Sequence, residues 1–268
     1  EIILGSRFYP GGSSLKLTIL GSGSILPTRN RFSSGILIES EGSGRFLLDI
    51  GPGALEKLRR IGADLSEIKA VFVSHLHVDH VLDLPALIKI RAYPPRRKLS
   101  IYGPRGIRDW IDLMITDRRL FGYLSNLKCH EILEIHECWE DSREIEPGVR
   151  LHTVPVEHFR GIAYKLEFPR GITITYSGDT IPDPRLIELA RGSTILIHEC
   201  SFPADKLKGK HTSDEDLVRI VKEVQPKILI AIHLYPEMED RVDELLSKLR
   251  AAFDGEVYVP KDLDEVEV

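Results

Sequence analysis

The residues best suited to chemistry in this chain form one dense segment, His75-Leu76-His77-Val78-Asp79-His80. It follows an apolar run, Ala70–Val73, that is typical of a buried strand. In an extended backbone, His75 and His77 would point to the same side. Asp79 and His80 then follow a turn, which could direct a second pair of ligands to a neighbouring point. Imidazoles and carboxylates suit zinc, and also manganese or iron, so this spacing predicts a metal site rather than a histidine-rich surface turn.

Further candidate residues occur downstream, nearly all of them where an apolar strand should end. These residues are His158, Asp179, His198, Glu199, His211 and His233. The run 172–176 precedes Asp179, the run 194–197 precedes His198 and Glu199, and the run 228–232 precedes His233. Strand ends that meet at one edge of a sheet would bring these side chains together.

The elements that must position these residues alternate between strands and helices. We expect strands at 15–20, 35–39, 45–49, 70–73, 172–176, 194–197, 228–232 and 256–259, and helices at 54–61, 82–91, 107–116, 214–224 and 240–252. Residues 127–151 have the pattern of short strands and turns. In the helix at 107–116, we expect Trp110, Leu113 and Met114 to face the core.

The His-x-His-x-Asp-His motif in this setting resembles the signature of the metallo-β-lactamase superfamily. The surrounding chain is similar to the ribonuclease Z-like branch of that superfamily, over roughly residues 15–260. Ser177–Thr180 resembles the bridging-aspartate motif of the branch, His198–Ser201 its His-Glu element, and His211–Ser213 its later histidine element. The resemblance implies an α/β fold of the α+β kind, a four-layer αββα sandwich of two mixed sheets, with the site along the edge between the sheets.

The resemblance also implies roles for individual residues. One cation would be held by His75, His77 and His158, the other by Asp79, His80 and His233, and both by Asp179. The catalytic residues would be Asp79, Glu199 and His211. Asp49, in the segment Asp49-Ile50-Gly51-Pro52-Gly53, would support one of the ligands from behind. We expect His198 to be a buried structural residue.

The predicted activity is phosphodiester hydrolysis by a hydroxide that bridges two divalent cations, most readily zinc, with manganese or iron as alternatives. An imidazolium at His211, held by Glu199, could protonate the leaving oxygen. Thr212 and Ser213 could instead serve only to cap the helix that follows them. Two other interpretations remain open: hydrolysis of a lactone, thioester or sulfate ester on the same cations, and a metal-dependent binding protein without turnover.

The nature of the phosphodiester is a separate question. Ribonuclease Z enzymes usually carry a long tRNA-gripping arm between the third ligand and the bridging aspartate, and here residues 159–178 leave no room for it. The segment Asp49–Gly53 also departs from the acidic DCGEG-type sequence of those enzymes. The sequence therefore favours small phosphodiesters slightly over pre-tRNA, with a tRNA 3′-end endonuclease as the alternative.

Two basic segments are further candidates for substrate contact. Arg29 and Arg31 lie in a loop after the first strand and could bind a phosphate or simply be solvated. A second group of cations is either a solvated face or a grip for a polyanion: Arg91, Arg96, Arg97, Lys98, Arg105 and Arg108. His130, His136 and His152 have no ligand partner at a useful spacing, so we predict no function for them.

The composition bounds the remaining possibilities. The 268 residues, 42% hydrophobic and 29% charged, suit one large domain over 1–268. A net charge of −5 indicates no general affinity for nucleic acid. Cys129, Cys138 and Cys200 fit reduced thiols in a cytoplasmic protein, and no membrane-length run or signal peptide is evident. We expect a phosphodiester substrate, either a small molecule or RNA, no membrane contact, and leave a homodimer open.

Overall fold

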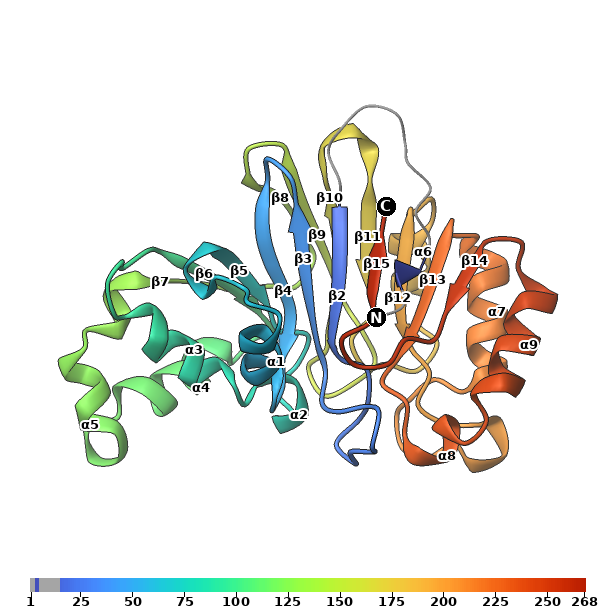
Figure 1. The fold of residues 1–268 in the computed structure, drawn as a ribbon, viewed down its shortest axis with the longest axis horizontal. Coiled ribbons are helices and arrows are strands. Elements are labelled where there is room, and N and C mark those ends of the chain that lie inside the picture. The colour runs from blue at the N-terminus through green and yellow to red at the C-terminus, as the bar shows by residue number, and fades with distance from the viewer. Residues whose placement is uncertain (1–2, 5–14) are drawn as a thin grey trace.

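Two mixed β-sheets pack face to face with helices on their outer sides (Figure 1). The computed structural model describes residues 3–4 and 15–268. In spatial order the 8-stranded sheet contains β1 (Ile3–Leu4), β15 (Glu265–Glu267), β2 (Leu15–Gly21), β3 (Gly35–Ser40), β4 (Gly44–Ile50), β5 (Ile68–Phe72), β6 (Leu99–Gly103) and β7 (Leu133–Glu137). The 7-stranded sheet contains β14 (Glu256–Tyr258), β13 (Ile228–Ile232), β12 (Ile195–Glu199), β11 (Thr173–Tyr176), β10 (Ile162–Glu167), β9 (Val149–Pro155) and β8 (Asp141–Glu146).

Helices cover the outer face of each sheet. The first sheet is covered by α1 (Ala54–Arg60), α2 (Val78–Val81), α3 (Leu84–Arg91), α4 (Ile107–Ile111), a π-helical turn (Asp112–Thr116) and α5 (Arg118–Asn126). The second is covered by α6 (Pro184–Ala190), α7 (Asp214–Val224) and α9 (Val242–Ala252), with α8 (Pro236–Glu239) below them in Figure 1. Among the described residues, no helix combines the length and apolar character needed to cross a bilayer.

Three apolar layers hold this arrangement together. The central layer lies between the sheets and includes Leu17, Phe46, Tyr164 and Ile230. One outer layer joins the first sheet to its helices, and the other joins the second sheet to α7 and α9. Alternate residues of a strand face opposite sides, so Ile19 of β2 belongs to the central layer and its neighbour Leu20 to an outer one. The four-layer αββα sandwich predicted from the sequence is therefore confirmed.

Strand direction explains where the candidate residues gather. β11, β12 and β13 are parallel neighbours in one sheet, and β4, β5 and β6 are parallel neighbours in the other. Parallel strands end at the same edge, which is where ligands bind in open α/β sheets. A bridge between Gly23 and Leu234, with a 3.2 Å hydrogen bond from Leu234 N to Ser22 O, joins the two sheets at this edge. The loops after β5, β11, β12 and β13 thus meet.

The sequence misjudged some helical details. The helix expected at 82–91 is α3, which begins two residues later at Leu84, whereas the short α2 before it and α5 were not predicted. Trp110 and Met114 do pack against the outer layer of the first sheet, but Leu113 is 53% exposed, so its predicted core position is wrong. Leu113 lies in the π-helical turn, whose wider spacing rotates its side chains away from the positions that a 3.6-residue period predicts.

Candidate metal centre

Seven side chains with ligand atoms converge at the edge where the two sheets meet: His75, His77, Asp79, His80, His158, Asp179 and His233. They form two groups, within each of which the ligand atoms lie no more than 4.8 Å apart. We call His75, His77, His158 and Asp179 the outer cluster, and Asp79, His80 and His233 the inner cluster. These are the seven residues that the sequence singled out. The tertiary structure brings all of them together.

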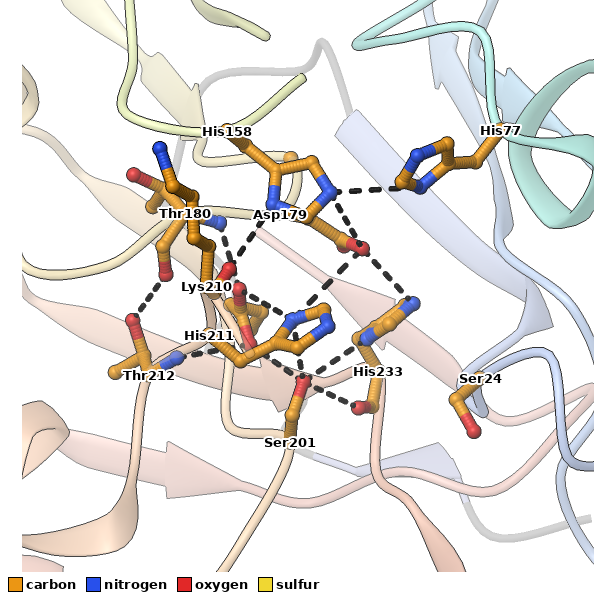
Figure 2. A network of polar contacts seen from close by, with 12 residues as sticks. Ser24, His77, His158, Asp179, Thr180, Ser201, Lys210, His211, Thr212 and His233 are labelled. Carbon is orange, nitrogen blue, oxygen red and sulfur yellow. Dashed lines mark hydrogen bonds and ion pairs between the residues drawn. The ribbon is translucent and has the colours of Figure 1, made fainter. Parts of the chain in front are cut away.

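In the outer cluster, three imidazoles surround one oxygen of Asp179. Oδ2 of Asp179 lies 3.7 Å from Nε2 of His75 and 4.0 Å from Nε2 of His158. Nδ1 of His77 lies 3.4 Å from Nε2 of His158. Figure 2 shows His77 and His158 approaching the Asp179 carboxylate from the same side. His75 is fully buried, whereas His77 is exposed, so this cluster is open to solvent on one side.

In the inner cluster, the two imidazoles face each other. Nε2 of His80 and Nε2 of His233 are only 3.2 Å apart. The Asp79 Oδ2 atom lies 3.7 Å from the first and 3.5 Å from the second. Asp179 reaches this cluster too, because its Oδ2 atom is 3.3 Å from Nε2 of His233. All three members of the inner cluster are buried.

Hydrogen bonds behind the imidazoles determine which nitrogen faces the centre. Nδ1 of His80 donates to Asp49 at 2.7 Å, and Nδ1 of His158 donates to the Lys210 carbonyl at 2.9 Å. Nδ1 of His233 lies 3.0 Å from the Ser201 hydroxyl, and Nδ1 of His75 lies 3.0 Å from the Ser74 hydroxyl. A ring nitrogen that donates in this way leaves the other one unprotonated. Bare Nε2 atoms therefore point inward.

This arrangement fits divalent cations. Lone pairs of Nε2 atoms and carboxylate oxygens meet at short range, which is unfavourable unless positive charge lies between them. Two buried atoms of the outer cluster, Nε2 of His75 and Oδ1 of Asp179, have no hydrogen-bond partner. Neutral imidazoles with carboxylates are the donors that zinc, manganese and iron accept in proteins. The seven residues can hold one cation in each cluster.

The charge balance at the centre favours ionised carboxylates. Burial alone would raise the pKa of Asp179, but the neighbouring His233 and His80 hold it well below its usual range. Burial likewise opposes charge on His80, yet Asp179 and Asp49 raise its pKa well above the ordinary value. Burial and the nearby His80 keep the pKa of His75 well below the usual range. The buried carboxylates of Asp179 and Asp49 therefore favour positive charge at the centre.

Asp49 supports the inner cluster through a hydrogen bond to the ring nitrogen of His80 that faces away from the cluster. Its buried carboxylate accepts hydrogen bonds from the backbone N–H of Ser74 at 2.7 Å, the hydroxyl of Ser74 at 2.7 Å, and the Tyr176 hydroxyl at 2.5 Å, besides the one from His80. The resemblance predicted this support. Gly51 follows two residues later because a Cβ there would lie 2.0 Å from the Asp79 carbonyl oxygen.

Glu199 and His211 form a second polar unit beside the clusters, and Figure 2 shows His211 next to Asp179 and His233. The buried Glu199 carboxylate accepts the backbone N–H groups of Thr180 at 2.6 Å and Thr212 at 3.1 Å, and the Ser201 hydroxyl. Nδ1 of His211 lies 3.1 Å from Oε1 of Glu199. Burial lowers the pKa of His211, but Glu199 outweighs this and raises it above the ordinary value. The Ser213–Asp216 capping box exists as well, and it does not involve His211.

Sequence reasoning missed three residues that orient this site: Ser74, Tyr176 and Ser201. Each lies next to a motif that was recognised, and each hydroxyl contacts Asp49 or Glu199. Tyr176 ends β11, three residues before Asp179, and its pairing with Tyr164 on β10 buries it between the sheets. A hydroxyl-bearing residue at or near a buried strand end, within three residues of a ligand or of Glu199, was the available signal.

Arg31 fits neither of the two alternatives left open for it, a phosphate contact or a solvated loop residue. Arg31 is 2% exposed, and its guanidinium donates to the Ser22 hydroxyl and to the carbonyls of Val259 and Pro260. These bonds tie the loop after β2 to the segment before β15. Arg31 therefore stabilises the fold, and of the two loop arginines only Arg29 is exposed.

The basic group between Arg91 and Arg108 is used mainly for structure. Arg91 is 2% exposed and donates to four backbone carbonyls, those of Leu65, Ile68, Arg97 and Lys98. Arg96 and Arg108 donate to carbonyls as well, Arg97 and Lys98 pair with glutamates, and Arg105 lies over the Trp139 ring. The interpretation as a grip for a polyanion finds no support in these contacts.

Among the described residues, His130, His136, His152 and His198 lie outside the groups that could hold a cation, whereas His211 forms a third such group with Asp179 and His233. His152 pairs with Glu167 at 3.3 Å, and His136 stacks on Tyr102. His198 is buried on β12, with Nδ1 2.7 Å from the Glu199 carbonyl, in agreement with a structural role. The three cysteines are buried and unpaired.

Comparison with known proteins identifies the relationship. A family model described as "Anti-Pycsar protein Apyc1" matches residues 15–255. The chain belongs to this family. An uncharacterized Mycobacterium tuberculosis protein is 32% identical over 260 residues, which cover 91% of this chain and 89% of that protein. A ribonuclease Z of Methanosarcina acetivorans is 29% identical, over 95% of this chain and 98% of that protein.

A solved structure agrees with placing this member of the Apyc1 family in the metallo-β-lactamase superfamily. The metallo-β-lactamase fold protein YhfI from Bacillus subtilis superimposes with a TM-score of 0.78 at 22% identity, over 95% of this chain and all of that one (100%). Together with the ribonuclease Z relative, this confirms the resemblance drawn from the sequence. The protein is a member of the ribonuclease Z-like branch of the metallo-β-lactamase superfamily.

Proposed function

We propose that the protein is a metal-dependent phosphodiesterase with one divalent cation in each cluster and Asp179 between them. The observation that carries this proposal is the convergence of bare imidazole nitrogens on the Asp179 and Asp79 carboxylates. Zinc is the first expectation because most of the ligands are imidazoles, and manganese or iron are the alternatives. When bound, two such cations supply a strong nucleophile near neutral pH and offset charge on the phosphoryl oxygens.

His211 is the residue that we assign to the leaving group. With Nδ1 held 3.1 Å from Glu199, the Nε2–H of a protonated ring is free to face a substrate. An imidazolium in this place donates a proton to the departing oxygen and stabilises negative charge on the phosphoryl group. Glu199 acts through His211 as a positioning residue, and Asp79 acts as a ligand that also orients the nucleophile.

Two considerations favour a phosphodiester over a lactone, thioester or sulfate ester. One is the His211–Glu199 pair, since a carboxylate-held imidazolium suits an alkoxide leaving group. The other is the name of the Methanosarcina acetivorans relative, a ribonuclease Z, which supports a hydrolase of the phosphodiester type. A binding protein without turnover would not need the second polar unit.

Small phosphodiesters fit better than pre-tRNA. Between His158 and Asp179 the chain forms β10, the short 3₁₀ turn Pro169–Gly171 and β11, with no extension beyond the sheet. The basic residues from Arg91 to Arg108 are largely committed to carbonyls and glutamates. We therefore expect cyclic nucleotides or short oligonucleotides as substrates, and tRNA 3′-end cleavage as the alternative.

The test uses bis(p-nitrophenyl) phosphate with the zinc- or manganese-loaded protein. Glu199→Ala and His211→Ala should each lower turnover by about 10²–10³-fold while both cations are retained, because the imidazolium stabilises charge on the phosphoryl group even though p-nitrophenolate leaves without a proton. His152→Ala, which removes a histidine outside the centre, should leave turnover unchanged. Metal content is measured on the same samples by mass spectrometry.

The outcomes separate the alternatives. Cleavage of a 3′-extended pre-tRNA at the discriminator end would identify a tRNA-processing nuclease instead. Diester turnover that survives both substitutions would contradict the role of the Glu199–His211 pair. No turnover of either substrate would overturn the phosphodiesterase proposal and favour the ester, lactone or binding interpretations.

A further inference from the structure

Phe159, the residue after His158, presents an aromatic ring beside the outer cluster. The ring stacks on the imidazole of His77, with centroids 5.7 Å apart and planes only 14° apart. Despite this contact, Phe159 is 58% exposed, the highest fraction among the exposed large apolar residues of the described chain. One part of the ring therefore packs against a predicted ligand, and the rest is open to solvent.

The position of this ring is set by a short hydrogen-bonded turn. Val156 N donates to Gly161 O at 3.0 Å, and Gly161 N donates back to His158 O at 3.2 Å. The backbone N–H of Glu157 donates to the buried Asp183 carboxylate at 3.0 Å. Phe159 lies inside this turn, so the turn fixes the position of its ring against the imidazole of His77.

Positive charge accompanies the ring. The Arg160 guanidinium lies 6.0 Å from the Phe159 centroid, and its Nη1 atom lies 3.5 Å from the Arg105 carbonyl. The Arg105 guanidinium in turn lies 4.5 Å from the ring of Trp139, which is 41% exposed. Exposed aromatic rings interleaved with cations are the surface that nucleotides favour, because bases stack on the rings and phosphates pair with the cations.

We propose that Phe159 is a specificity-determining residue, the platform on which a substrate base stacks while its phosphate lies at the two clusters. The inference rests on the proposed phosphodiesterase function and narrows it. Diesters that carry a nucleoside are bound through Phe159, and diesters of simple aliphatic alcohols are not. Arg160 adds positive charge beside the stacked base.

Two substrates with the same leaving group test this inference: thymidine 5′-(p-nitrophenyl phosphate) and methyl p-nitrophenyl phosphate. Phe159→Ala should raise KM for the thymidine substrate about tenfold or more, as expected for loss of one base–aromatic stack. KM for the methyl substrate, kcat for both, and metal content should stay the same. Calorimetric titration with thymidine 5′-monophosphate and with inorganic phosphate gives a measure that does not depend on turnover, and only the nucleotide should lose affinity.

Two further variants separate stacking from support of His77. Phe159→Leu fills the space against the imidazole but has no aromatic face, so it should lose thymidine affinity like Phe159→Ala, and Phe159→Tyr should retain it. Tyr123→Ala is the matched control, since Tyr123 on α5 is also an exposed ring (54%) beside a cation, Lys89, and it contacts neither cluster. This variant should leave KM and kcat unchanged for both substrates.

Several results would overturn the inference. Equal effects on both substrates, or loss of metal from Phe159→Leu, would make Phe159 a support for His77 only. Unchanged KM for thymidine in Phe159→Ala would exclude the platform. If the unmodified protein hydrolyses neither substrate, the proposed function fails, and the calorimetric comparison of the nucleotide with phosphate decides the inference about Phe159 separately.

Discussion

The inner and outer clusters have similar ligands, yet the protein surrounds them differently. Side chains support the inner cluster, because Asp49 holds His80 and Ser201 holds His233. In the outer cluster, only the buried His75 contacts a supporting side chain, the Ser74 hydroxyl, whereas His158 contacts the Lys210 backbone carbonyl and His77 is exposed. The difference indicates that the two clusters have different roles. The ligands of the inner cluster are held rigidly, and the outer cluster is the one that a substrate can reach.

Backbone conformation differs between the clusters in the same way. His233 has a φ of 59° and Asp49, which supports the inner cluster, has a φ of 55°. Such left-handed conformations are unfavourable for residues other than glycine, so they persist only where the surrounding contacts hold them. Among the ligands of the outer cluster none has a positive φ. Aspartate and histidine adopt this conformation more readily than most residues, so the two positions indicate a defined backbone at the inner cluster rather than large strain.

The largest effect is expected from Asp179→Asn, because Asp179 belongs to both clusters. Asparagine keeps the size of the side chain but removes its charge and one ligand oxygen. Both cations should bind more weakly, and turnover of bis(p-nitrophenyl) phosphate should fall on the order of 10³-fold, equivalent to several kcal/mol of transition-state stabilisation. Metal content and turnover, measured together, test this. Two tightly held cations with nearly normal turnover would refute the shared role.

Asp49→Asn should affect the inner cluster more than the outer one, because Asp49 contacts His80 directly and His75 only through Ser74. Asparagine tolerates a positive φ, so the backbone is preserved while the charged acceptor of His80 is lost. Loss of such an outer partner typically costs about 10–100-fold in metal affinity or activity. One cation per chain should remain at moderate metal concentration. Tyr176→Phe, which removes a single donor to Asp49, is the milder control, and equal loss from both clusters would contradict the difference between them.

Chelator titration should release the two cations in sequence. The outer cation, beside the exposed His77, should leave at a chelator concentration about tenfold lower than the inner one, a difference within the range attributed to supporting partners. The release is followed by metal analysis of the protein at each step. Simultaneous release would mean that Asp179 couples the two clusters more strongly than their surroundings distinguish them.

The smallest effect is expected from Lys210→Ala. The Lys210 side chain pairs with Glu157, but these side chains are 62% and 50% exposed, so solvent screens the pair and it contributes little to stability. The contact to His158 comes from the backbone carbonyl, which alanine keeps. Affinity for the outer cation should change less than about twofold by calorimetry. A large loss would show that the ion pair positions this segment.

The sequence predicted the candidate metal ligands better than it predicted the roles of the arginines. Six of the seven candidate ligands follow apolar strands, His158 being the exception, and a buried strand is a strong local pattern that can be recognised without the structure. Arg31 and Arg91 looked like candidates for contact with a phosphate or polyanion, because local sequence gives no sign that a guanidinium is buried. Their partners are carbonyls of residues far along the chain or on neighbouring loops, such as Pro260 and Ile68.

The sequence by itself determined the chemistry available to this protein, since strand periodicity and ligand type are both local properties. Only the tertiary structure decided which ligands are buried, which nitrogen each histidine presents and which partners hold it. Tyr176 and Asp49 are 127 residues apart, and His80 and His233 are 153 apart, yet each pair is in contact. Such contacts depend on how the two sheets pack, and the packing of the central layer is a property of the whole fold.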